Sequence, residues 1–104
     1  MLRGHLDRMI LAVFEGEPLH GYAVMKALQR RSDGALDLLT GTLYPALRRL
    51  GRAGYLCSDW STVAGRRRRT YSLTAAGGRM LADERAEWRA FSSLVDDVLW
   101  SADQ

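Results

Sequence analysis

The chain has 104 residues, which is enough for one ordinary domain and too few for two independent cores. Hydrophobic residues make up 47% and charged residues 26%, with a net charge of +3, a balance that argues against a disordered or membrane-embedded protein. The single cysteine excludes an internal disulfide framework and a multi-cysteine zinc site, and Met1–Arg8 lacks the apolar run of a signal peptide, so we expect a cytoplasmic protein that does not bind membranes.

The first third of the chain has the apolar spacing of two amphipathic helices. Hydrophobic residues recur every three or four positions from about Leu2 to Phe14, and Gly16–Pro18 ends that helix. A second helix is predicted from about Gly21 to Arg31, and Ser32–Gly34 forms the turn after it.

A third helix is indicated by Leu43, Leu47 and Leu50, which share one face. Proline is harmless only in the first turn of a helix, so Pro45 predicts a cap close to Thr42 and a helix that runs to about Ala53.

The pattern then changes to two β-prone segments, Tyr55–Trp60 and Arg68–Leu73, separated by the glycine-containing loop Ser61–Gly65. Thr74 is the expected cap of a long last helix. The predicted fold is mainly α with a small β hairpin: a winged helix-turn-helix unit over residues 1–73, followed by a C-terminal dimerisation helix over residues 74–104, in one structural unit.

The side of the third helix opposite its leucines carries Gly41, Tyr44, Arg48 and Arg52. Arginine can fork onto the O6 and N7 atoms of guanine, so this face is suited to the major groove of DNA. A solvated basic face is the alternative for an isolated helix of this pattern.

The predicted hairpin tip concentrates four positive charges, Arg66–Arg69, on what we expect to be a flexible turn. Like charges repel, so the confinement of four arginines favours a polyanion as partner. The alternative explanation for the abundance of arginine is a GC-rich genome, which also converts lysine to arginine, and Lys26 is the only lysine here. Strand alternation puts Arg67 and Arg69 on one face and Arg66 and Arg68 on the other. We expect Arg66, Arg67 and Arg68 to bind phosphates, whereas Arg69 is equally suited to a structural ion pair.

Four segments, Leu2–Asp7, Pro18–Tyr22, Gly41–Leu50 and Gly65–Thr74, resemble the PadR-type transcriptional regulators. The strings HGY and GTLYPALRRL are the more specific part, because a basic wing ending in YSLT occurs in other winged-helix proteins. The resemblance implies a homodimeric repressor that holds a palindromic operator with its second and third helices and its wing, and pairs its subunits through the last helix. It also implies that four residues lie near the DNA, namely Tyr22, Thr42, Tyr44 and Arg48.

The chain departs from the family pattern in two places. Ala75–Gly78 replaces a more usual proline-containing entry to the last helix, and the chain stops after one such helix, which puts in doubt any ligand domain larger than the dimer interface.

The last helix carries an aromatic stripe that a small core cannot cover, which is typical of a protein interface. Some family members bind flat aromatic compounds between tryptophans at the dimer interface, and Trp88 is the corresponding candidate here. The alternative is that Trp88 only packs against protein in the core of the dimer interface, and the helical spacing of the aromatic residues favours that alternative. The residues expected in the dimer interface or in an effector pocket are Leu6, Leu81, Trp88, Phe91, Val95 and Val98.

No nucleophile, base and orienting group form a catalytic set, so we expect no enzyme and no cofactor. His5 and His20 lack a further ligand at metal-site spacing, and Cys57 is expected to be buried beside Leu56. Besides an effector-released repressor, two other functions fit the pattern: a winged-helix module that binds another protein, and a dimer that binds small molecules without operator specificity.

Overall fold

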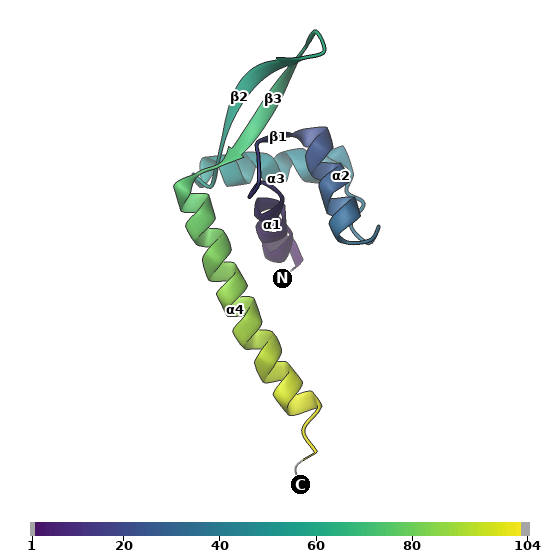
Figure 1. Cartoon of the computed structure of the whole chain (residues 1–104), viewed down its shortest axis with the longest axis vertical. Coiled ribbons are helices and arrows are strands. Elements are labelled where there is room, and N and C mark those ends of the chain that lie inside the picture. The colour runs from purple at the N-terminus through teal and green to yellow at the C-terminus, as the bar shows by residue number, and fades with distance from the viewer. Residues whose placement is uncertain (1, 103–104) are drawn as a thin grey trace.

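The computed structural model describes residues 2–102, which form four helices and a three-stranded sheet (Figure 1). The helices are α1 (Leu2–Val13), α2 (Gly21–Arg31), α3 (Thr40–Arg52) and α4 (Ala75–Leu99), and the strands are β1 (Leu19–His20), β2 (Leu56–Val63) and β3 (Arg66–Leu73). The strand order is β1-β3-β2 and both pairings are antiparallel. The expected winged helix-turn-helix with an added C-terminal helix is confirmed.

The molecule is elongated, with extents of 65 × 28 × 22 Å. In Figure 1 the hairpin of β2 and β3 extends from one end of the helical core, and α4 extends from it in the opposite direction. No helix within residues 2–102 combines the length and the apolar character that crossing a bilayer requires.

The core lies between α1, α2 and α3. Each of the three helices turns one apolar stripe inward. The largest fully buried side chains are therefore spread over all three helices: Ile10, Leu11, Val24, Leu43 and Leu47. Leu56 of β2 closes the core on the side of the sheet.

The start of α3 differs from the expectation of a cap near Thr42. The helix begins at Thr40 after Leu39, whose carbonyl accepts from the N–H groups of Thr42 and Leu43, and no side chain caps it. Pro45 therefore lies inside the helix, where the N–H it lacks would have bonded to the carbonyl of Gly41. Gly41 is exposed, so water can solvate that carbonyl and the helix tolerates the proline.

The hairpin is longer than expected, and the predicted loop over residues 61–65 is wrong. Val63 pairs with Arg66, and only Ala64 and Gly65 connect the strands, with φ angles of 53° and 77°. Two consecutive positive φ angles make a type I′ turn, whose twist matches that of the flanking strands. The arginines consequently lie on a paired strand and not on a flexible turn.

Two smaller features of the sheet also differ from the sequence expectations. Strand β1, which pairs Leu19 with Tyr71 and His20 with Thr70, was missed because two residues are too few to show a period. Cys57 is exposed, and the expectation that it is buried is wrong, since Leu56 takes the inward side and the next residue of a strand points the other way.

Helix α4 is anchored over its first half. The Thr74 hydroxyl accepts from the N–H of Gly77 at 3.0 Å, which confirms the predicted cap, and donates to the carbonyl of Gly54 at 2.6 Å. Ion pairs tie the next turns to α1 and the segment after it: Arg8–Glu84 at 2.6 Å and Arg85–Glu15 at 2.8 Å.

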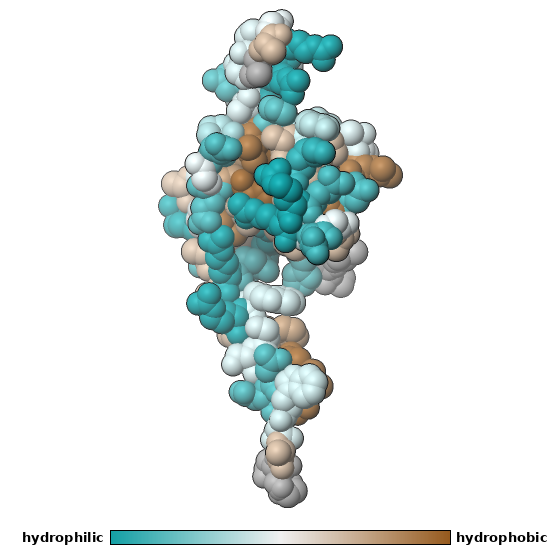
Figure 2. All heavy atoms as spheres, turned by 45° about the vertical axis from the view of Figure 1, so that its right-hand side comes forward, coloured by the Kyte–Doolittle hydropathy of each residue, from teal (hydrophilic) through white to brown (hydrophobic). Residues whose placement is uncertain are grey.

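The residues of α4 that are buried or pack against the core are near its start, at Gly77, Met80 and Leu81. Figure 2 shows hydrophobic atoms gathered along one side of the far end of the helix. The exposed large hydrophobic residues of α4 are Trp88, Phe91, Leu94, Val98 and Leu99, and Trp100 follows at its end.

Candidate nucleic-acid interface

The outward face of α3 is formed as the sequence predicted. Its leucines are buried, and the residues on the opposite side are all exposed: Gly41, Thr42, Tyr44, Arg48 and Arg52. Because the helix is held by its leucines and by flanking turns, this face is presented on a rigid element.

Arg49 differs from its neighbour Arg48 in its surroundings. Its Nε and Nη2 atoms donate to the two oxygens of Asp7 on α1 at 3.1 and 2.9 Å, and this hydrogen bonding raises the pKa of Arg49. Across the described residues 2–102, neither Arg48 nor Arg52 forms an ion pair. Of the three arginines on α3, one is used to join α3 to α1, and two are left for a partner.

One side of the Tyr44 ring packs against the protein, and the other side is exposed. The ring packs against Gly21 at the start of α2, where a methyl group on Gly21 would lie 2.7 Å from Cζ of the ring, and 37% of Tyr44 is exposed. Tyr22, the next residue of α2, is also exposed, and the Nζ atom of Lys26 lies 5.7 Å from its ring centroid.

The start of α2 is tied to β3 through one histidine. The Nδ1 atom of His20 accepts from the N–H of Ala23 at 3.4 Å, so His20 is the cap of α2. The Nη1 atom of Arg68 lies 3.4 and 3.3 Å from the two ring nitrogens of His20. Arg68 is half-buried, and its guanidinium group lies against His20 at the start of α2.

The other face of the wing carries Arg67 and Arg69, as the alternation predicted. Both guanidinium groups lie over the ring of Trp60, with Cζ at 4.8 and 5.3 Å from its centroid. The ion pairs found within residues 2–102 do not include Arg69, whose Nε instead donates to the Ser58 hydroxyl at 3.0 Å. Arg66 is exposed beside the turn.

Trp60 was missed as a candidate by the sequence reasoning. It lies directly opposite Arg69 in the strand register. The available signal was the arginine alternation combined with a hairpin centred on Ala64 and Gly65, because that register places Trp60 on the face of Arg67 and Arg69.

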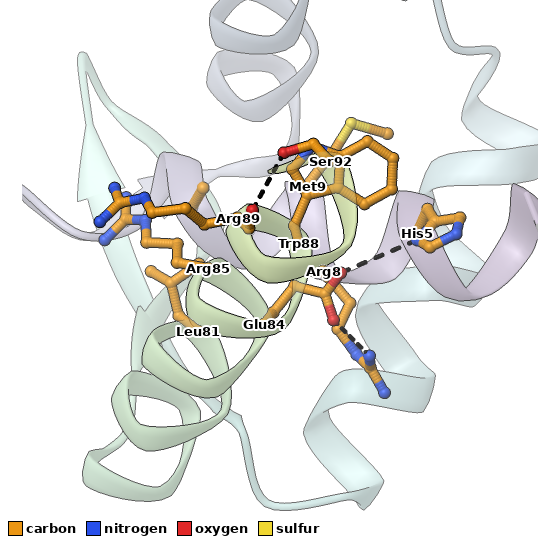
Figure 3. Close-up of a pocket in the computed structure, with 10 residues that line it drawn as sticks. His5, Arg8, Met9, Leu81, Glu84, Arg85, Trp88, Arg89 and Ser92 are labelled. Carbon is orange, nitrogen blue, oxygen red and sulfur yellow. Dashed lines mark hydrogen bonds and ion pairs between the residues drawn. The ribbon is translucent and has the colours of Figure 1, made fainter. Parts of the chain in front are cut away.

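A second candidate site is a cleft of about 640 Å³ between α1 and α4. Figure 3 shows Glu84 of α4 between His5 and Arg8 of α1, at 3.7 and 2.6 Å, with Trp88 beside them. The His5 and Trp88 rings meet edge to face with their centroids 5.6 Å apart. A mixed apolar and charged wall of this kind suits an aromatic molecule or an opposing protein side chain equally well.

The residues that the sequence predicted for the dimer interface or the effector pocket differ in burial: some are buried, some are half-buried and some are exposed. Leu81 is buried within its own chain and lines the cleft together with Trp88, and Leu6 is half-buried against the core. Phe91 leans on Trp88 with centroids 5.9 Å apart, Val95 is half-buried, and Val98 is exposed. In residues 2–102, no three histidine, cysteine or acidic side chains are placed to share a metal ion.

Comparison with known proteins gives the family. The sequence pattern of the "Transcriptional regulator PadR-like family" matches residues 10–83, which is most of the chain. The chain belongs to the PadR-like family. Members of this family are transcriptional regulators and not enzymes.

A curated relative of this PadR-like protein is "Transcriptional regulator Rv3488" of Mycobacterium tuberculosis, which is 46% identical over 81 residues, 78% of this chain and 70% of the relative. A PadR-family transcriptional regulator from Eggerthella lenta has a solved structure that matches with a TM-score of 0.80 at 32% identity, over 98% of this chain and 88% of that one. Bacillus subtilis PadR, solved in complex with operator DNA, matches with a TM-score of 0.67 at 22% identity, over 75% of this chain and 45% of that chain, a likeness of fold.

Proposed function

We propose that this PadR-like regulator is a repressor that binds a palindromic operator as a homodimer and is released by a small aromatic effector. The observation that carries the DNA-binding part is a contrast between three arginines that join elements of the fold and six arginines on the outer face of α3 and on the wing. Arg8, Arg49 and Arg85 are paired with carboxylates and join elements of the fold. Within residues 2–102, the arginines of the outer α3 face and of the wing form no ion pairs: Arg48, Arg52, Arg66, Arg67, Arg68 and Arg69.

The unpaired arginines have different tasks in this proposal. Arg48 and Arg52 enter the major groove from α3, with Arg48 reading a guanine edge, and Tyr44 contacts a phosphate or a thymine methyl. Tyr22 and Thr42 border the same groove from the starts of α2 and α3. Arg66, Arg67 and Arg68 bind the phosphate backbone, which contributes affinity to every sequence alike. The likeness of fold to Bacillus subtilis PadR, which was solved in complex with operator DNA, supports DNA as the partner.

The homodimer rests on the apolar side of α4. Trp88, Phe91 and Val98 are 53%, 56% and 70% exposed, and an exposed apolar stripe of this length is costly in water unless a partner covers it. A second copy, packed through α4 with Val95 and with Leu6 of α1 at its border, is the simplest partner with a matching stripe. A two-fold pair would present two α3 helices about one DNA turn (~34 Å) apart, so the operator should be palindromic.

Release by an effector rests on the cleft between α1 and α4. The cleft reaches Trp88, whose ring offers a stacking surface, and it lies beside the proposed dimer contacts. A flat aromatic molecule bound there would change the packing of α4 against α1, and with it the separation of the two α3 helices. If Trp88 only fills the interface, aromatic compounds will leave operator affinity unchanged.

The proposal is tested with the DNA that flanks the gene of this protein. The purified protein should protect a short inverted repeat there, bind it ~10³-fold or more tightly than random DNA at physiological salt, and sediment as a dimer. Equal binding of operator and random DNA would end the repressor proposal. Capture of a protein through α3 and the wing, without DNA preference, would instead support an interaction module, and binding of aromatic compounds alone would support a small-molecule-binding dimer.

A further inference from the structure

Trp60 is a large aromatic residue on the wing that lies outside the hydrophobic core. Its side chain is 52% exposed, whereas an indole is highly buried on average. It faces Arg69 across the β2–β3 pair, and Arg67 follows two positions away on the same face of β3. Its neighbours are therefore cations and not core side chains.

Both arginines rest on the Trp60 ring, with Cζ atoms 4.8 and 5.3 Å from its centroid. Arg69 is held a second time, because its Nε donates to the Ser58 hydroxyl at 3.0 Å. A guanidinium on an aromatic ring uses its flat face and keeps its N–H edge for other acceptors. The contacts thus order the two side chains and leave terminal N–H groups available.

The same arrangement offsets the repulsion between two cations that stand two residues apart on one strand. Neither Arg67 nor Arg69 has a carboxylate partner within the described chain. The electron-rich face of the indole attracts both cations, but it carries no net charge, so the wing still lacks a counter-ion. A phosphate backbone supplies one.

We infer that Trp60 is a positioning residue for DNA binding, which orders Arg67 and Arg69 before they meet the phosphates, and that Arg69 is itself a phosphate-binding residue. The inference rests on the proposed DNA binding. An arginine that is already ordered loses less conformational entropy when it binds, so the ring strengthens binding without touching the DNA. Its removal should weaken binding about tenfold while the number of phosphate contacts stays the same.

The experiment compares Trp60→Ala, Trp60→Leu and Trp60→Phe on a short duplex of random sequence over a series of salt concentrations. Phe keeps an aromatic ring, and Leu keeps apolar volume without one. Ala and Leu should raise Kd about tenfold with the same slope of log Kd against log salt as the wild type, and Phe should stay within about threefold. Arg67→Ala/Arg69→Ala should instead lower the slope by about 2, one phosphate contact for each arginine.

A role confined to hairpin stability is separated by two further measurements. Thermal unfolding reports whether each variant is folded, and the Nε–Hε relaxation of Arg69 in the absence of DNA should show a more mobile side chain in Trp60→Leu than in Trp60→Phe. In the Arg67→Ala/Arg69→Ala background, Trp60→Ala should have no further effect on Kd, because a positioning residue acts only through the residues it positions.

The inference is overturned if folded Trp60→Leu binds random DNA as tightly as the wild type, or if Trp60→Ala weakens binding equally with and without the two arginines. These results are independent of the operator. A wild-type protein that binds its flanking DNA no better than random DNA would overturn the proposed repressor, and the Trp60 comparison on random DNA would still support or overturn the positioning role.

Discussion

The hydroxyl group of Tyr44 on α3 lies against Gly21, the first residue of α2, and the space between them cannot hold a methyl group. These two residues belong to the two most specific strings of the chain, HGY and GTLYPALRRL. The contact sets how closely α3 approaches α2, and Tyr44 presents its exposed side from that position. The glycine is therefore needed for the geometry of the outer α3 face.

Gly21→Ala should lower the free energy of unfolding by about 1–3 kcal/mol, because the new methyl group displaces the Tyr44 ring. Gly41→Ala is the matched control on α3, where nothing lies within 4 Å, and it should raise stability by about 0.5–1 kcal/mol through helix propensity. Urea unfolding measures both. Equal stabilities of the two variants would show that the Tyr44–Gly21 contact is not tight.

A second pair of glycines, Gly77 and Gly78, tests how closely the first turn of α4 packs against Tyr55. A methyl group on Gly77 would collide with the backbone carbonyl of Tyr55, whereas Gly78 faces open space. Gly77→Ala should therefore lower the Tm by more than Gly21→Ala does, because a backbone carbonyl yields less readily than a tyrosine side chain, and Gly78→Ala should raise the Tm slightly. Differential scanning calorimetry gives the comparison, and a stable Gly77→Ala variant would contradict the close approach of α4 to Tyr55.

Arg48 and Arg49 should separate DNA recognition from stability. Arg48→Ala should cost ~1–3 kcal/mol of operator affinity, relax base preference at one position and leave the Tm unchanged, since Arg48 is exposed and unpaired in the described chain. Arg49→Ala should lower the Tm, because it leaves Asp7 without its two hydrogen bonds, and keep the base preference. Fluorescence anisotropy on operator variants, together with thermal unfolding, measures both effects; the opposite pattern would mean that the outer face of α3 is assigned incorrectly.

The ion pair between Glu15 and Arg85 predicts a dependence of stability on pH. The hydrogen bond from Arg85 holds the pKa of Glu15 below its usual value of 4.5, against a smaller opposing effect of burial. A depressed pKa in the folded state means that the stabilisation is present above pH 4.5 and is lost as pH falls through the folded pKa. The wild type should lose more of its Tm than Glu15→Gln between pH 5 and about pH 3, and parallel curves would show that the pair contributes nothing.

The dimer can be tested by placing a charge on the apolar side of α4. Val98→Glu should raise the dimer dissociation constant by about 100-fold or more, because burying an unpaired carboxylate in an interface is costly. Val98 is 70% exposed, so the fold of the chain should survive. Ser93→Glu, on the opposite side of α4, is the control and should leave the constant within about threefold. Sedimentation equilibrium measures it, and unchanged dimers for both would place the interface elsewhere.

The order of elements and the outward face of α3 could be predicted from the sequence, because apolar periodicity over a dozen residues reports which side of a helix is buried. The leucines of α3 were enough to place Tyr44 and Arg48 outside. Alternation along β3 likewise separated Arg67 from Arg68 without any knowledge of the partner strand.

Other features depended on contacts between residues far apart in the chain. Arg48 and Arg49 are the same residue type at adjacent positions, and only the approach of Asp7, 42 residues away, makes one structural and leaves the other unpaired. Strand β1 exists because β3 offers it backbone partners, and Trp60 meets Arg67 and Arg69 because a two-residue turn sets the register. Periodicity shows the side on which a residue stands, whereas the charge or ring opposite it is determined only when another element packs there.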